Sequence, residues 1–147
     1  MNCNETLFEL ISSIEAYPFG GTSSLETMSV HEKSVSEEKM GLDMSSMIQV
    51  PMKIKSCSPS EKRVVELPGD SYEVTVSWEI AKLNKDTYNV LQHLYEEPNH
   101  LILRTYDSKG YFIRCEEEGY DFSYEEKDGL LECTVTIHNK NGLQRIL

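Results

Sequence analysis

The chain has 147 residues, of which 25 are Asp or Glu and 14 are Lys or Arg, so its formal net charge at pH 7 is −11. This length suits one domain, and the acidic balance argues against binding nucleic acid or an anionic membrane through clustered basic residues. The apolar runs are far shorter than the ~20 residues of a membrane-spanning helix. Because Met1–Glu5 carries no basic residue, we expect no signal peptide and a soluble protein.

The first segment of the chain carries a helical pattern. Its apolar side chains recur at intervals of three and four, which predicts a short amphipathic helix over residues 6–14. Tyr17–Gly21 contains a proline and two glycines, and these residues end the helix. The residues with helical spacing are Leu7, Leu10, Ile11 and Ile14.

Residues 22–47 consist mostly of Ser, Thr, Glu and Met and follow neither a strand nor a helix period. Such a segment buries too little apolar surface to offset the entropy of ordering it. We therefore expect residues 1–47 to form an N-terminal arm that is either flexible and extended or ordered against a neighbouring subunit. In the second case its adaptable apolar contacts would be Met28, Met40, Met44 and Met47.

From residue 48 onward the pattern changes to strands, and residues 48–147 are expected to form a β domain. Apolar residues alternate over Ile48–Ile54, although Pro51 marks an edge strand or a bulge. Ser58–Glu61 is expected to be a loop, and Val64–Leu67 a short strand. The clearest alternation runs over Tyr72–Ile80, which should anchor one sheet.

One helix interrupts the strands. Asn84 or Asp86 can cap its N-terminus, and Pro98 ends it. The residues at helical spacing are Tyr88, Leu91, Leu94 and Tyr95.

The rest of the chain reads as strands separated by tight turns, which favours antiparallel pairing because parallel strands need long crossovers. In total the pattern predicts seven or eight strands. The fold class is therefore mainly β (α+β), with antiparallel β-sandwich or barrel-like sheets, one packed α-helix and an extended N-terminal arm. The expected strands after the helix are Leu101–Tyr106, Tyr111–Cys115, Tyr120–Glu125, Leu131–His138 and Leu143–Leu147.

Eight carboxylates gather between residues 116 and 132. Three interpretations stay open: a solvated face, a negative functional surface, or a cation site, although their order does not match a loop that wraps an ion. Tyr120, Phe122 and Tyr124 alternate with some of these acids, which favours core packing over stacking on bases. The candidate acidic surface comprises Glu116, Glu117, Glu118, Asp121, Glu125, Glu126, Asp128 and Glu132.

No motif for catalysis or cofactor binding is present, so we expect no enzyme activity, no cofactor and no metal. The four cysteines form no Cys-x-x-Cys pair and are expected to be free thiols. A nucleophilic pair of Cys115 with His138 is the remaining enzymatic possibility, and a small enzyme using Cys115 or Cys133 ranks last among the hypotheses.

From residue 64 to residue 147 the order is a long strand, a short helix and a run of hairpins. This order resembles the tail-tube superfamily of bacteriophages, with its tail-completion and hub relatives and the tube proteins of injection systems. Because residues 1–47 lack the likeness, an adaptor, completion or hub-like part fits better than a plain tube monomer. The stretches that carry the resemblance are Tyr72–Glu79, Leu103–Phe112 and Leu131–Ile137.

The resemblance implies a structural virion protein, assembled in the bacterial cytoplasm, that forms a homo-oligomeric ring, commonly sixfold, with other tail proteins as partners. DNA would pass through the lumen without specific binding, because a negative wall gives phosphates nothing to hold. The alternative is a monomeric cytoplasmic binding module whose acidic hairpin docks a basic partner.

Overall fold

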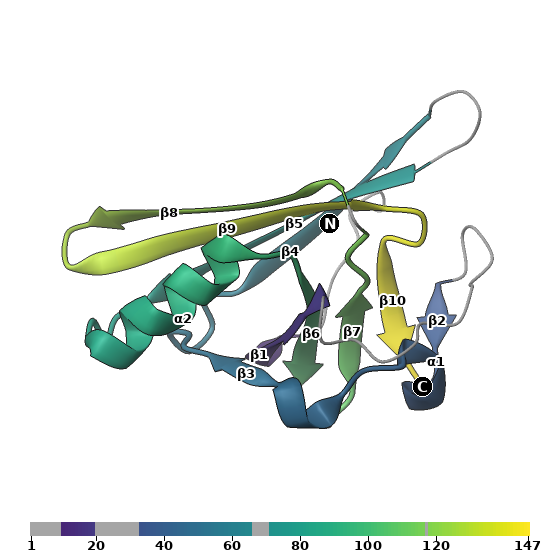
Figure 1. Cartoon of the computed structure of the whole chain (residues 1–147), viewed down its shortest axis with the longest axis horizontal. Coiled ribbons are helices and arrows are strands. Elements are labelled where there is room, and N and C mark those ends of the chain that lie inside the picture. The colour runs from purple at the N-terminus through teal and green to yellow at the C-terminus, as the bar shows by residue number, and fades with distance from the viewer. Residues whose placement is uncertain (1–9, 20–32, 66–70, 117) are drawn as a thin grey trace, which may run out of the picture.

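The computed structural model describes residues 10–19, 33–65, 71–116 and 118–147. These residues form ten strands in two sheets (Figure 1). The elements are β1 (Ile11–Pro18), β2 (Ser34–Val35), α1 (Glu37–Met40), the 3₁₀ helix η2 (Met44–Ser46), β3 (Ile48–Val50), β4 (Ser58–Val64), β5 (Ser71–Ile80), α2 (Lys85–Glu96), β6 (Asn99–Thr105), β7 (Gly110–Ile113), β8 (Tyr120–Lys127), β9 (Leu130–Asn139) and β10 (Leu143–Ile146).

Two long strands form the centre of the four-stranded sheet, whose order is β4-β5-β9-β8. β5 and β9 pair antiparallel without interruption from Tyr72 opposite Asn139 to Ile80 opposite Leu131. Alternate side chains of β5 are buried, as the period-2 pattern predicts. The expectation that this strand anchors a sheet is confirmed.

The other sheet has six strands in the order β2-β10-β7-β6-β1-β3. Residues 11–18 lie inside this sheet as β1, paired with β6 on one side and β3 on the other. Eight strands come from residues 48–147, and the arm segment supplies β1 and β2 in addition. Part of the segment expected as an arm therefore belongs to the folded sheet.

The prediction of a helix over residues 6–14 is wrong for residues 11–14, which form the first half of β1. The pairing of β1 with β6 shifts register between Ile11 and Ser13, so β1 accommodates one extra residue there. This bulge brings Ile11 and Ile14, three positions apart, to buried positions. A bulged strand thus imitates helical spacing in the sequence.

β4 occupies a segment that was expected to begin with a loop. Its first four residues, Ser58–Glu61, pair with β5, so the loop prediction is wrong. β4 is an edge strand with mostly exposed, polar residues, and the sequence therefore shows no apolar alternation there. An edge strand also tolerates Pro59. β3 in turn ends at Val50, and Ile54 lies in a turn instead of a strand.

The main core fills the space between the two sheets, whose strands cross in Figure 1. Trp78 of β5 is fully buried there and stacks on Phe122 of β8, with 6.2 Å between ring centroids. α2 contributes Leu91 and Leu94 to the same core. The predicted fold class, mainly β with one packed helix, is confirmed by these sheets and α2. No helix of the described residues is long and apolar enough to cross a membrane.

A smaller core lies on the opposite face of the six-stranded sheet. Tyr17, Val35, Ile102 and Phe112 project from the sheet, and Met40 of α1 packs against them. β2, to which Val35 belongs, pairs parallel with β10. Residues 33–47 therefore pack on their own chain.

Asn84 caps α2. Its side-chain oxygen accepts a hydrogen bond from the N–H of Thr87 at 2.9 Å, which satisfies one of the free donors of the first turn. We expect Asn84→Ala to lower the free energy of unfolding by about 1 kcal/mol. Asn84→Asp keeps the acceptor and serves as the control in chemical denaturation. Equal stability of both variants would contradict the role of the cap.

Candidate functional site

The outer face of the four-stranded sheet is polar over most of its length. Residues that face each other across β4, β5, β9 and β8 form continuous rows at right angles to the strands. Most side chains in these rows carry hydroxyl groups. Two successive rows are Ser58, Ser77, Thr134 and Ser123, and Ser60, Thr75, Thr136 and Asp121.

The next row of this face is acidic. Glu132 of β9 lies opposite Glu79 on one side and opposite Glu125 on the other. Like charges directly opposite each other are destabilising in a sheet, so this row has to stay in contact with water. Among the described residues no group of three or more His, Cys, Asp or Glu side chains could hold a metal ion.

The predicted acidic surface follows the β8–β9 hairpin and its approach. Glu116 is half-buried, and Glu117 lies outside the described residues. The hairpin therefore carries exposed charge toward one edge of the sheet. The exposed members are Glu118, Asp121, Glu125, Glu126, Asp128 and Glu132.

The two edges of this sheet differ in charge. In the described part of the chain neither β4 nor β8 has a second partner strand. Glu61 of β4 forms an ion pair with Lys33, which leaves a basic balance on that edge. The exposed charges are Lys62 and Arg63 on β4, and Asp121, Glu125, Glu126 and Lys127 on β8.

The predicted methionine contacts are divided by the structure. Met28 lies outside the described residues, and Met40 is buried in the smaller core. Met44 and Met47 are exposed, at 60% and 39%. The prediction that Met40 contacts another subunit is therefore wrong, because residues of its own chain already cover its side chain.

The described cysteines are free thiols, as expected, while Cys3 lies outside the described residues. Burial raises the pKa of Cys57, Cys115 and Cys133 to about 12. At neutral pH they are protonated, and the protonated thiol is a poor nucleophile.

The hypothetical pair of Cys115 with His138 is not brought together. The backbone N–H of Cys115 donates to Nδ1 of buried His100 at 2.8 Å. His138 lies on the exposed face of β9, with Nε2 3.8 Å from a carboxylate oxygen of Glu73. Neither residue thus supplies a base to the other.

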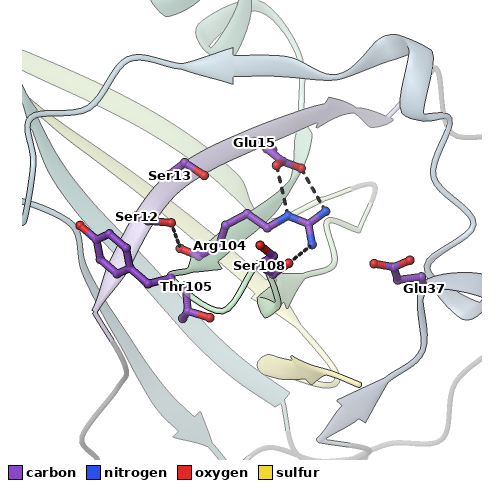
Figure 2. A pocket seen from close by; sticks show the side chains of 8 residues that line it. Ser12, Ser13, Glu15, Glu37, Arg104, Thr105 and Ser108 are labelled. Carbon is purple, nitrogen blue, oxygen red and sulfur yellow. Dashed lines mark hydrogen bonds and ion pairs between the residues drawn. The ribbon is translucent and has the colours of Figure 1, made fainter.

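A polar hollow of about 470 Å³ opens beside β1 and the β6–β7 hairpin (Figure 2). Arg104 of β6 points toward Glu15 of β1, and two of its nitrogens lie 3.1 and 3.3 Å from the carboxylate oxygens. A third nitrogen donates to the backbone oxygen of Ser108 at 3.1 Å. Tyr17 donates its hydroxyl to Glu15 at 2.7 Å.

The electrostatics of this cluster follow from its partial burial. Burial alone would lower the pKa of Arg104. The hydrogen bonds to Glu15 and its negative charge outweigh burial, so the pKa of Arg104 is raised. Burial, with the hydrogen bond to Glu15, raises the pKa of Tyr17. The cluster ties β1 to the β6–β7 hairpin, and all three guanidinium nitrogens already have acceptors within the chain. A ligand anion would have to compete with Glu15.

Local sequence spacing does not indicate this cluster. Glu15 and Arg104 lie 89 positions apart. The one local signal is a charged residue, Arg104, directly after the apolar run Leu101–Leu103.

Comparison of the chain with protein-family models, with curated proteins and with solved structures finds no match.

Proposed function

We propose that the protein is a structural subunit of a phage or phage-like tail, and that it assembles into a ring of the tube, hub or connector. The observation that carries the proposal is the four-stranded sheet, which combines a polar outer face with two open edges of opposite charge.

Strand direction favours head-to-tail assembly of this sheet. Successive strands β4, β5, β9 and β8 are all antiparallel, so β4 and β8 run in opposite directions. If β8 of one copy lies beside β4 of the next, the alternation continues across the contact. A contact between two different surfaces closes into a ring when its rotation divides a full turn. Pairing also saturates edges that would otherwise invite open-ended association.

Charge favours the same contact. β8 presents three acids, Asp121, Glu125 and Glu126, with one cation, Lys127, whereas β4 presents Lys62 and Arg63. Placing β8 against β4 of another copy brings opposite charges together, whereas β8 against a second β8 brings acids together. Repulsion between like charges disfavours the second arrangement. The contact is therefore directional.

The outer face of the sheet suits the wall of a channel. In a closed ring, hydroxyl groups and the row of Glu79, Glu132 and Glu125 would line the lumen. The hydroxyl and glutamate rows hold no cations, and their carboxylates repel DNA phosphates. Lys62 on the same face lies directly opposite Glu73, which offsets its charge, so a duplex would slide without binding.

The test is the mass of the full chain in solution, followed by negative-stain imaging. We expect a defined multiple of 16.9 kDa and ring-shaped particles. Glu125→Lys should shift the equilibrium toward monomer, since it places a cation against the basic β4 edge. Glu38→Lys, an exposed charge reversal on α1, is the matched control. A protein that stays monomeric at high concentration would overturn the proposal.

A further inference from the structure

Three exposed tyrosines line a groove of about 310 Å³ between α2 and β8. Tyr88, Gln92 and Tyr95 follow one stripe of α2, and Tyr124 faces them from β8. Tyr95 is 71% exposed, Tyr124 46% and Tyr88 41%. The alternating pattern of β8 predicted core packing for Tyr124, and its exposure shows that this prediction is wrong for Tyr124. Aromatic side chains gathered at a surface are typical of a contact with another molecule.

The rim of this groove is acidic. Glu126, two positions after Tyr124 on β8, projects from the same face of the sheet as Tyr124 and is exposed. Glu96 follows Tyr95 along α2, where its carboxylate accepts a hydrogen bond from Gln92 at 2.8 Å. An apolar group flanked by cations would satisfy both the tyrosine floor and this rim, because ammonium groups pair with carboxylates and with aromatic faces.

The chain carries such a group at the opposite edge of the sheet. Ile54 lies in the turn that leads into β4, between Lys53 and Lys55, and is 75% exposed. The turn is held in place: the N–H of Lys53 donates to the backbone oxygen of Glu79 at 2.7 Å, and the N–H of Ser56 donates to Lys53 at 3.1 Å. An exposed isoleucine on a fixed turn is an available anchor for another surface.

We propose that the turn Lys53–Lys55 of one copy docks into the tyrosine groove of the next copy. This inference rests on the proposed ring and names a second contact within it. Ile54 would pack on Tyr95 and Tyr124, and the two lysines would face the acidic rim.

The strand register places the turn Lys53–Lys55 and the tyrosine groove at the same height along the strands of the four-stranded sheet. Ser56 bonds to the backbone of Glu79 and so continues the edge of β5 past β4. The acidic row continues from Glu79 through Glu132 to Glu125, the neighbour of Tyr124. A second copy whose β4 extends the sheet beyond β8 in the same alignment would carry its turn to the level of Tyr124.

The two surfaces also lie on the same side of the four-stranded sheet. The turn comes from β3, which belongs to the six-stranded sheet, so the chain reaches β4 from the core side. α2 packs on that side through Leu91 and Leu94, and Figure 1 shows it beside the β8–β9 hairpin. An arriving turn therefore meets α2 instead of the outer face.

Substitutions on both sides of the contact test the proposal. We expect Ile54→Ala and Tyr95→Ala each to raise the dissociation constant of the assembly about tenfold, as loss of an anchor does. The double variant should be little weaker than either single variant, because both remove the same contact. Tyr106→Ala is the matched control, since Tyr106 is 65% exposed on the β6–β7 hairpin. Sedimentation velocity over a concentration series measures the four variants and the wild type.

Crosslinking tests the location directly. Ile54→Cys and Tyr95→Cys proteins, both also carrying Cys3→Ser, are mixed and treated with a short bismaleimide. A covalent dimer from this mixture, and none when Tyr106→Cys replaces Tyr95→Cys, supports the docking. If the wild type assembles but no dimer forms and Tyr95→Ala assembles normally, the docking is overturned and the ring proposal stands. A wild type that is monomeric at every concentration overturns both.

Discussion

Replacing Arg104 with alanine is expected to lower the free energy of unfolding by about 2–4 kcal/mol, because it leaves the carboxylate of Glu15 without its cation. The side chains of Arg104 and Glu15 are only 16% and 14% exposed, so water replaces the lost partner poorly. Because both side chains keep some exposure, the expected loss of stability is smaller than for a fully buried ion pair. Tyr17 would remain as a donor to Glu15, but it carries no charge. Urea denaturation monitored by fluorescence measures the change.

A double-mutant cycle separates the pair from the packing of the arginine stem. Glu15→Ala, Arg104→Ala and the double variant should give a coupling energy of about 2 kcal/mol. Arg104→Lys is a further control, since it keeps the charge and loses the forked geometry. A coupling energy near zero would mean that Arg104 stabilises the hairpin through its stem alone.

Long regular elements could be predicted from the sequence. β5 and β9 alternate over ten residues each, and one face of each is buried, so the period of two is visible without knowledge of the partner strand. α2 begins at Lys85, and its cap is Asn84, one of the two residues predicted for that role. In these segments a local pattern and the tertiary environment agree.

The elements that were predicted wrongly are those in which tertiary contacts, and not the local sequence, decide which residues are buried. β1 carries a bulge, and its buried residues therefore lie three apart. β4 is an edge strand with a polar sequence, so only its pairing with β5 makes it a strand. Met40 lies in a segment without any period, and it is buried because that segment covers Ile102 and Phe112.

The candidate surfaces divide in the same way. The acidic residues from Asp121 to Glu132 lie on one hairpin because they are close in sequence. The tyrosine groove joins Tyr124 to a helix some thirty positions earlier, and the opposing turn at Ile54 lies on a third segment. Spacing within α2 marked Tyr88 and Tyr95 as helical neighbours of Leu91 and Leu94, but it did not tell which stripe faced the core.

His100 makes stability depend on pH. It is fully buried on β6 between the rings of Phe19 and Phe112, whose centroids lie 5.5 and 6.0 Å away. Its Nδ1 accepts the N–H of Cys115, so the neutral ring carries its proton on Nε2. Protonation would add a second donor at Nδ1, facing that N–H. Burial, helped by the positive charge of Arg114, accordingly lowers the pKa of His100 from 6.5 to about 4.

We expect acidification from pH 6.5 to pH 4 to lower the free energy of unfolding by about 3 kcal/mol through His100 alone. Well above pH 6.5 the imidazole is neutral in both states and contributes no pH dependence. Below pH 6.5 the unfolded chain binds a proton that the folded chain rejects, so stability falls with pH. The loss levels off below the folded pKa of about 4, where both states are protonated. Denaturant titrations at half-unit intervals of pH give the slope.

His100→Asn isolates this contribution, because the asparagine oxygen can still accept the N–H of Cys115 but does not titrate. The variant should be less stable at pH 7, since it loses ring packing. Its stability should nevertheless fall less steeply than that of the wild type between pH 6.5 and 4. His138→Asn, at an exposed position on β9, should keep the wild-type slope. If His100→Asn and the wild type lose stability in parallel, the acid sensitivity resides in the carboxylates, and the burial of His100 does not govern it.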